Sequence, residues 1–75
     1  MSKTEKEVYW EGAEPLGCEL CEDDIKHEFI DGRTRWHCWG MLCPVCHTNC
    51  GVGLGLGKGQ RYVKQPDGKW LKVEG

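Results

Sequence analysis

The chain has 75 residues, of which 39% are hydrophobic and 29% are charged, and its formal net charge is −2. A chain this short has room for one domain, whose hydrophobic core rarely supplies more than a few kcal/mol without a metal or disulfides. The length excludes a large ligand cavity or a two-domain enzyme, and no apolar run approaches the ~18 residues of a transmembrane helix.

Residues 1–16 are predicted to form a polar N-terminal tail, and residues 17–75 a zinc-binding domain. The start of the chain, MSKTEKEVYWEG, is charged and has no apolar segment typical of a secretory signal, so we expect a cytoplasmic protein. Val8, Tyr9 and Trp10 are the exception within the tail, and we expect them to dock on the domain as a short strand.

Two CxxC pairs stand out among the six cysteines: CELC at 18–21 and CPVC at 43–46, with 21 residues between them. Two intervening residues let a tight turn aim both sulfurs at one point, and two such pairs complete the tetrahedron that Zn²⁺ prefers. We therefore predict one Zn²⁺ per chain. Its ligands would be Cys18, Cys21, Cys43 and Cys46.

Other uses of the cysteines remain open at this point. The same four thiolates can hold iron as in rubredoxins, and six cysteines can form three disulfides. Cys38 and Cys50 lie outside the pairs and are expected to be ordinary thiols. The alternatives are a second metal site that uses a histidine, His27, His37 or His47, and a disulfide between Cys38 and Cys50.

Residues 25–39 are predicted to form a β-hairpin with strands at 26–30 and 33–38. Asp31-Gly32 would make its two-residue turn, because both residue types tolerate positive φ. A helix is predicted over residues 44–50. Pro44 suits its first position, and Gly51 suits a left-handed stop after its last residue.

The glycine-rich segment GVGLGLGKG at 51–59 is predicted to be a strand with Val and Leu on one face and bare backbone on the other. All five glycines occupy odd positions, whereas GxGxxG and GxxxxGK[ST] need two glycines five residues apart. This parity argues against nucleotide binding. A second hairpin is predicted over residues 60–75, turning at Pro66-Asp67-Gly68.

These elements predict a small, metal-stapled α+β fold that is rich in β-structure, with two β-hairpins and one short helix. A CxxC pair, then a hairpin, then a helix that carries the second pair is the layout of a treble clef. Without the helix, the same spacing would give a zinc ribbon.

Charge is distributed unevenly along the chain. The net charge is −7 over residues 1–32, +2 over residues 33–49 and +3 over residues 50–75. In the basic part of the chain, cations alternate with aromatic residues. This pattern is typical of nucleic-acid binding, in which cations contact phosphates and rings stack on bases. An exposed hairpin whose aromatic residues form the core would give the same pattern. The candidate nucleic-acid contacts are Arg33, Arg35, Lys58, Arg61, Lys64, Lys69 and Lys72.

Catalysis is not expected. Asp23 and Asp24 are adjacent and would face opposite ways in a strand. A catalytic zinc keeps one coordination position open for water or substrate, whereas four cysteine ligands would fill all four positions.

The preferred hypothesis is a non-catalytic module that binds a protein through Trp10, the acidic face and the glycine-rich strand. The alternative is a nucleic-acid-binding zinc finger that uses the basic C-terminal hairpin, and the third is an iron electron carrier. We expect neither a membrane nor a nucleotide as partner.

The segments CELC, FIDGRTRW and MLCPVCHTNCGVGLGLGKGQRY together resemble small zinc-finger proteins of phages and prophages, a family of unassigned function. The resemblance covers residues 18–73 and implies the same four cysteine ligands and a bacterial or phage cytoplasmic setting. Cys38 and Cys50 lie outside the family's pattern, which argues against a second metal site as a property of the family.

Overall fold

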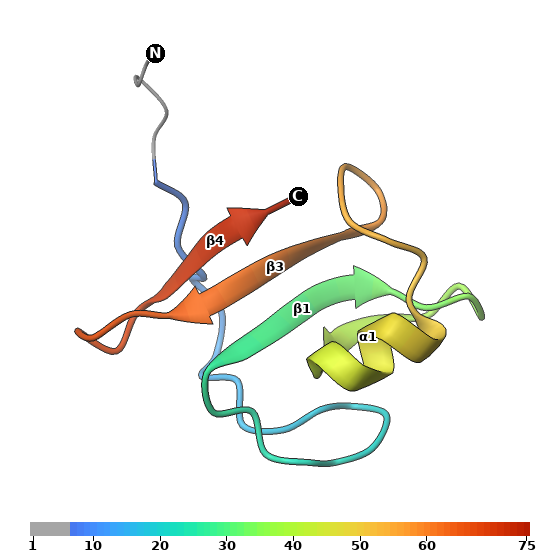
Figure 1. Ribbon diagram of the computed structural model, residues 1–75, viewed down its shortest axis with the longest axis horizontal. Coiled ribbons are helices and arrows are strands. Elements are labelled where there is room, and N and C mark those ends of the chain that lie inside the picture. The colour runs from blue at the N-terminus through green and yellow to red at the C-terminus, as the bar shows by residue number, and fades with distance from the viewer. Residues whose placement is uncertain (1–6) are drawn as a thin grey trace.

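A four-stranded antiparallel sheet forms the frame of the computed structural model, which describes residues 7–75 (Figure 1). The spatial order of the strands is β2-β1-β3-β4. The elements in chain order are β1 (Glu28–Arg33), β2 (Trp39–Leu42), α1 (Pro44–Cys50), β3 (Gly59–Lys64) and β4 (Trp70–Glu74). The prediction of a β-rich fold with two hairpins and one short helix is confirmed.

Strand β1 lies inside the sheet and is buried on both faces. Phe29 and Ile30 point to opposite faces because side chains alternate along a strand, and both are fully buried. Phe29 packs in an aromatic cluster with Tyr62 and Trp70, whose rings lie 5.1 and 5.2 Å from it. Helix α1 contacts β1 and β2 (Figure 1). The small core is therefore divided between an aromatic side and a helical side.

The N-terminal segment completes the aromatic side. The Trp10 N–H donates to the Trp70 carbonyl at 2.9 Å, and the Lys72 N–H donates to the Val8 carbonyl at 2.7 Å. The Trp10 ring meets Phe29 edge-on at 5.2 Å. The expected docking of residues 8–10 is confirmed. Residues 1–6 of the predicted tail lie outside the described residues, and the division of the chain at residue 16 stays a prediction.

The predicted turn at Asp31-Gly32 is wrong, and so are the strand bounds that depended on it. Both residues lie within β1, where Asp31 pairs with Met41 and Gly32 with Gly40. The chain turns later, over residues 34–38. There the Thr34 N–H donates to the Cys38 carbonyl at 2.8 Å.

Gly32 is needed for close packing between strands. A Cβ atom at this position would lie 3.1 Å from the Lys58 carbonyl oxygen and 3.3 Å from the Gly59 Cα. A strand glycine commonly marks such a close approach of two backbones. Pairing with β3, which no local pattern reveals, therefore overrides the turn preference of Asp-Gly.

Replacing Gly32 with Ala is expected to destabilise the fold by about 1–3 kcal/mol, the usual effect of overpacking a close contact. Gly40→Ala is the matched control, because Gly40 pairs with Gly32 and its Cβ would meet the movable carboxylate of Glu19. Urea unfolding should show a clearly smaller loss for Gly40→Ala. Equal losses would contradict the close-approach explanation.

Helix α1 spans the predicted residues, and Pro44 opens it as expected. The predicted left-handed stop at Gly51 is wrong, because its φ is −77°. Its N–H still closes the helix by donating to the His47 carbonyl at 2.8 Å. Glycine is required there for space, since a Cβ atom would run into the His47 ring and carbonyl.

The glycine-rich segment is a loop, and the predicted strand over residues 51–59 is wrong. Gly53, Gly55 and Gly57 have φ values of +115°, +124° and +77°, a region that side chains rarely adopt. The loop is closed by the Gly55 N–H, which donates to the Gly59 carbonyl at 2.8 Å. Leu56 is 97% exposed. The alternate glycines therefore serve the backbone conformation of a loop that leads into β3.

The second predicted hairpin is confirmed. The Gln65 N–H donates to the Lys69 carbonyl at 2.7 Å, and the Gly68 N–H donates to the Gln65 carbonyl at 2.9 Å. Gly68 adopts a φ of +90°, which the turn between β3 and β4 requires.

Candidate metal centre

Four cysteine sulfurs from two distant segments meet beside the sheet. The Sγ atoms of Cys18, Cys21, Cys43 and Cys46 all lie within 4.8 Å of one another. The structure therefore brings together the four residues that the CxxC spacing singled out, and the group can hold a metal ion.

The first CxxC pair lies in a short loop before β1. An antiparallel bridge between Gly17 and Asp24 closes this loop. The Cys18 N–H donates to the Asp23 carbonyl at 2.9 Å, and the Glu19 N–H donates to the Met41 carbonyl on β2 at the same distance. These contacts tie a segment without regular structure to the sheet.

The second pair lies where β2 passes into α1. Cys43 is the N-cap of the helix, and its sulfur accepts a hydrogen bond from the Cys46 N–H at 3.4 Å. The Cys18 sulfur accepts the equivalent bond from the Leu20 N–H at 3.4 Å. Backbone donors aimed at sulfur stabilise the thiolate, which is the form that binds metal.

One sulfur–sulfur distance in the group matches a tetrahedral thiolate shell. Cys21 Sγ and Cys43 Sγ lie 3.7 Å apart. Metal–sulfur bonds of about 2.3 Å in a tetrahedron place neighbouring sulfurs about 3.8 Å apart. A disulfide needs about 2.05 Å, and the six cysteines are free thiols.

The environment shifts the pKa values of Cys18 and Cys46 in opposite directions. Burial raises the pKa of Cys18, but backbone N–H groups of Cys21, Cys43 and Leu20 outweigh burial and lower it to about 6. Burial, followed by hydrogen bonds with the neighbouring thiols, raises the pKa of Cys46. Cys18 is therefore favoured as a thiolate near neutral pH, and a bound cation would displace protons that remain on the cluster.

The other candidate ligands lie elsewhere. Within residues 7–75, the four-cysteine group is the one set of His, Cys, Asp and Glu side chains that is close enough to hold a metal. Cys38 is exposed and Cys50 is half-buried. His47 is 9% exposed, and its Nε2 lies 3.0 Å from the Gly53 carbonyl oxygen. His47 therefore connects α1 to the glycine-rich loop, a role that its sequence position did not reveal.

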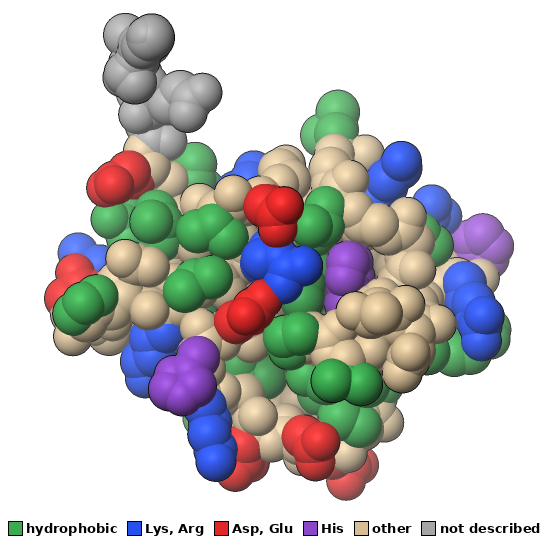
Figure 2. All heavy atoms as spheres, in the orientation of Figure 1, with side chains coloured by type: hydrophobic (Ala, Val, Ile, Leu, Met, Phe, Trp, Pro, Cys, Tyr) green, Lys and Arg blue, Asp and Glu red, His purple; other side chains and the backbone are tan. Residues whose placement is uncertain are grey.

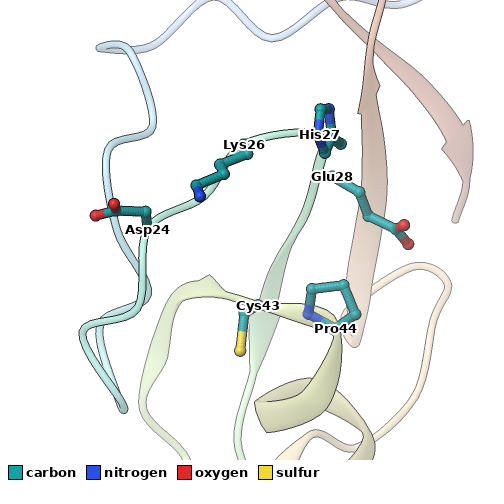
Figure 3. A pocket seen from close by; sticks show the side chains of 6 residues that line it. All are labelled: Asp24, Lys26, His27, Glu28, Cys43 and Pro44. Carbon is teal, nitrogen blue, oxygen red and sulfur yellow. The ribbon is translucent and has the colours of Figure 1, made fainter.

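A shallow hollow of about 240 Å³ lies next to Cys43. It is lined by Asp24, Lys26, His27, Glu28, Cys43 and Pro44. Figure 3 shows the carboxylates of Asp24 and Glu28 pointing away from each other and from the Cys43 sulfur. The side chains around the hollow do not converge on a common point.

The seven candidate nucleic-acid contacts do not form one surface. Arg61 is bound between Glu28 and Glu74. Burial lowers the pKa of Arg61, but these two carboxylates outweigh it and raise the pKa above its usual value. The guanidinium of Arg61 is therefore engaged in ion pairs within the protein and is not free to contact a phosphate.

Five of the other six cations lie at opposite ends of the sheet. The antiparallel pairing of Glu28 with Val63 and of Gly32 with Gly59 sets this direction. One end carries Arg33, Arg35 and Lys58. The other end, at the turn between β3 and β4, carries Lys64 and Lys69, and Lys72 lies in the middle of β4 opposite Tyr62.

No protein-family model, curated protein or solved structure matches the chain. Among residues 7–75, no helix has the length and apolar character that crossing a membrane requires.

Proposed function

We propose that this chain is a non-catalytic binding module whose fold is held together by one Zn²⁺ ion. The observation that supports the proposal is the four-cysteine group, with its sulfurs within 4.8 Å of one another. Structural zinc sites are closed four-coordinate shells of this kind.

The finer fold assignment is part of the proposal. A CxxC pair, the β1–β2 hairpin, and a helix that carries the second pair follow one another along the chain. This order supports a treble-clef arrangement. The helix argues against the zinc-ribbon alternative, in which the second pair would lie in a turn between strands.

Two observations support a role without catalysis. Four cysteine ligands leave no position at the metal for water or substrate. The hollow beside Cys43 has diverging side chains rather than a nucleophile with a base (Figure 3). Such a module acts through what its surface binds. The protein partner and the phage or prophage origin stay predictions.

Native mass spectrometry of freshly purified protein, with elemental analysis, tests the metal. We expect one zinc per chain, and we expect Cys46→Ser to lose zinc because one of four ligands is removed. Cys38→Ser is the matched control and should keep one zinc, since Cys38 lies outside the cluster.

Other results would change the proposal in defined ways. Iron in place of zinc would favour the electron-carrier hypothesis, and two zincs per chain would require a second site. A metal-free protein with a mass six hydrogens lower would indicate three disulfides and overturn the zinc proposal.

A further inference from the structure

One long segment of the chain contains no acidic residue. Residues 32–66 include neither Asp nor Glu, although the whole chain is weakly acidic. The segment holds five cations, and one of them, Arg61, is bound by two carboxylates from outside it. A basic segment of the chain therefore follows the acidic residues of the N-terminal part.

Backbone hydrogen bonds gather three of these cations at one end of the sheet. The Arg33 N–H donates to the Lys58 carbonyl at 2.9 Å, and the Arg35 N–H donates to the Cys50 carbonyl at 2.8 Å. The first bond joins the end of β1 to the loop before β3, and the second joins the turn after β1 to the end of α1. We call Arg33, Arg35, Trp36, His37 and Lys58 the basic end.

The basic end is visible on the surface. Figure 2 shows Lys or Arg side chains and a histidine gathered at the right, where Figure 1 places the turn after β1. Within residues 7–75, both ion pairs involve Arg61, so Arg33, Arg35 and Lys58 have no carboxylate partner. Of the acids near this end, Asp31 accepts a hydrogen bond from the Trp39 indole at 2.8 Å, and the Glu19 carboxylate lies beside Gly40.

An aromatic ring is exposed among these cations. Trp36 is 56% exposed, and the guanidinium of Arg35 lies over its ring at 5.2 Å from the centroid. His37 adopts a φ of +69°, a left-handed conformation that histidine tolerates better than most residues, and it belongs to the turn that presents the ring. A large aromatic in a tight turn, outside the core, is available for a ligand.

Arg33 has unused hydrogen-bonding capacity. Its Nη1 lies 3.3 Å from His37 Nδ1, and its Nε is buried without a partner in the described part of the chain. A buried donor without a partner is uncommon in folded proteins. This Nε has no exposed surface, so the ligand-facing groups of Arg33 are its terminal Nη atoms rather than Nε.

We propose that the basic end binds single-stranded nucleic acid, with Trp36 stacking on an unpaired base and Arg33, Arg35 and Lys58 contacting phosphates. Cations beside an exposed aromatic ring are the combination that binds single strands without a fixed sequence. The inference names the partner class of the binding module proposed above, and it rests on that proposal.

Charge complementarity favours a short single strand over a long duplex. Duplex DNA carries one charge per ~1.7 Å of its axis, so a long duplex would extend beyond three cations towards the acidic residues. At physiological salt, charges farther apart than about 8 Å are largely screened, so the basic end acts locally despite the net charge of −2.

Fluorescence anisotropy of labelled oligothymidylate tests the proposal on protein that carries one zinc by native mass spectrometry. Three phosphate contacts predict that log affinity falls with log salt with a slope of about −2, at ~0.7 per contact on single strands. The double variant Arg35→Gln/Lys58→Gln should reduce the slope to about −0.7.

The role of the ring is tested separately. Trp36→Ala should weaken binding by about 5- to 150-fold, the range for losing one stacked base. Trp36→Phe should retain most of the affinity because it keeps an aromatic face. Unfolding midpoints must match the wild type, so that any loss reflects binding rather than folding.

The control variant Lys64→Gln/Lys69→Gln removes the same charge at the opposite end. Both lysines also lie over aromatic rings, Lys64 over Trp70 at 5.6 Å and Lys69 over Tyr9 at 5.7 Å. The affinity of this double variant for the oligonucleotide, and the slope of its salt dependence, should stay at the wild-type values.

Two outcomes would overturn the inference while leaving the zinc module intact. The first is no binding by folded, zinc-loaded protein, which would leave a protein as the partner class. The second is equal weakening by the two double variants, which would indicate a general charge effect. A chain without zinc would instead refute the proposed function itself.

Discussion

Removal of the metal is expected to unfold the domain. The largest fully buried side chains are only Phe29, Ile30 and Leu42, so the core of the described chain is small. Structural zinc contributes about 10–16 kcal/mol in small zinc fingers, as much as the whole stability of an ordinary domain. The loop of the first CxxC pair contains no helix or strand, so the metal would supply most of its attachment to α1.

The amide region of a proton–nitrogen NMR spectrum measures this outcome. We expect dispersed signals in the zinc-loaded protein and collapsed signals after chelation, with recovery when Zn²⁺ is added back. Dispersion that persists after verified, complete removal of the metal would show that the sheet folds without it.

Cys43→Ser separates the loss of a ligand from the loss of a helix cap. Cys43 is both a predicted ligand and the N-cap of α1, and serine is a favoured N-cap residue. The variant therefore keeps the cap and removes one metal–sulfur bond, and it should unfold as the chelated protein does. Cys50→Ser, at the other end of α1 and outside the cluster, should stay folded.

Trp10→Ala is expected to give the second large effect, a loss of about 2–4 kcal/mol. Full truncation of a buried Phe or Trp costs about 3–5 kcal/mol, and Trp10 is only partly buried. Its ring lies edge-on to Phe29 at 5.2 Å and to Tyr62 at 5.5 Å, so the change would open the aromatic cluster to water. It would also remove the hydrogen bond from the indole Nε1 to the Ala13 carbonyl.

Denaturant unfolding of the zinc-loaded protein measures this loss, with Trp36→Ala as the matched control. Trp36 is 56% exposed and lies outside the aromatic cluster, so its truncation should change the stability by less than ~0.5 kcal/mol. A Trp10→Ala variant as stable as the wild type would show that residues 8–10 are an appendage rather than part of the core.

Features that depend on neighbouring residues could be predicted from the sequence. The CxxC spacing identified the four cysteines that the structure brings together, because two intervening residues determine how a tight turn presents its sulfurs. Pro44 marked the start of α1, and Pro66-Asp67-Gly68 marked the turn between β3 and β4. Each of these signals is contained within a few residues.

The glycines were misinterpreted because their role depends on partners far along the chain. Gly32 has a turn-forming neighbour, yet the Lys58 carbonyl and Gly59 lie against it and keep it within β1. Gly51 was expected to stop the helix through its backbone angles, but the His47 ring determines the need for glycine. These contacts cannot be predicted from the residues that neighbour each glycine in the sequence.

The sequence by itself determined the cysteine cluster, the helix that carries half of it, the second hairpin and the uneven distribution of charge. Only the tertiary structure decided where that charge acts. The pairing of β3 with both β1 and β4 places Arg61 between Glu28 and Glu74, and it puts Arg33, Arg35 and Lys58 at the end opposite Lys64 and Lys69. The physical reason is that spacing along the chain controls local geometry, whereas strand pairing between distant residues controls which side chains share a surface.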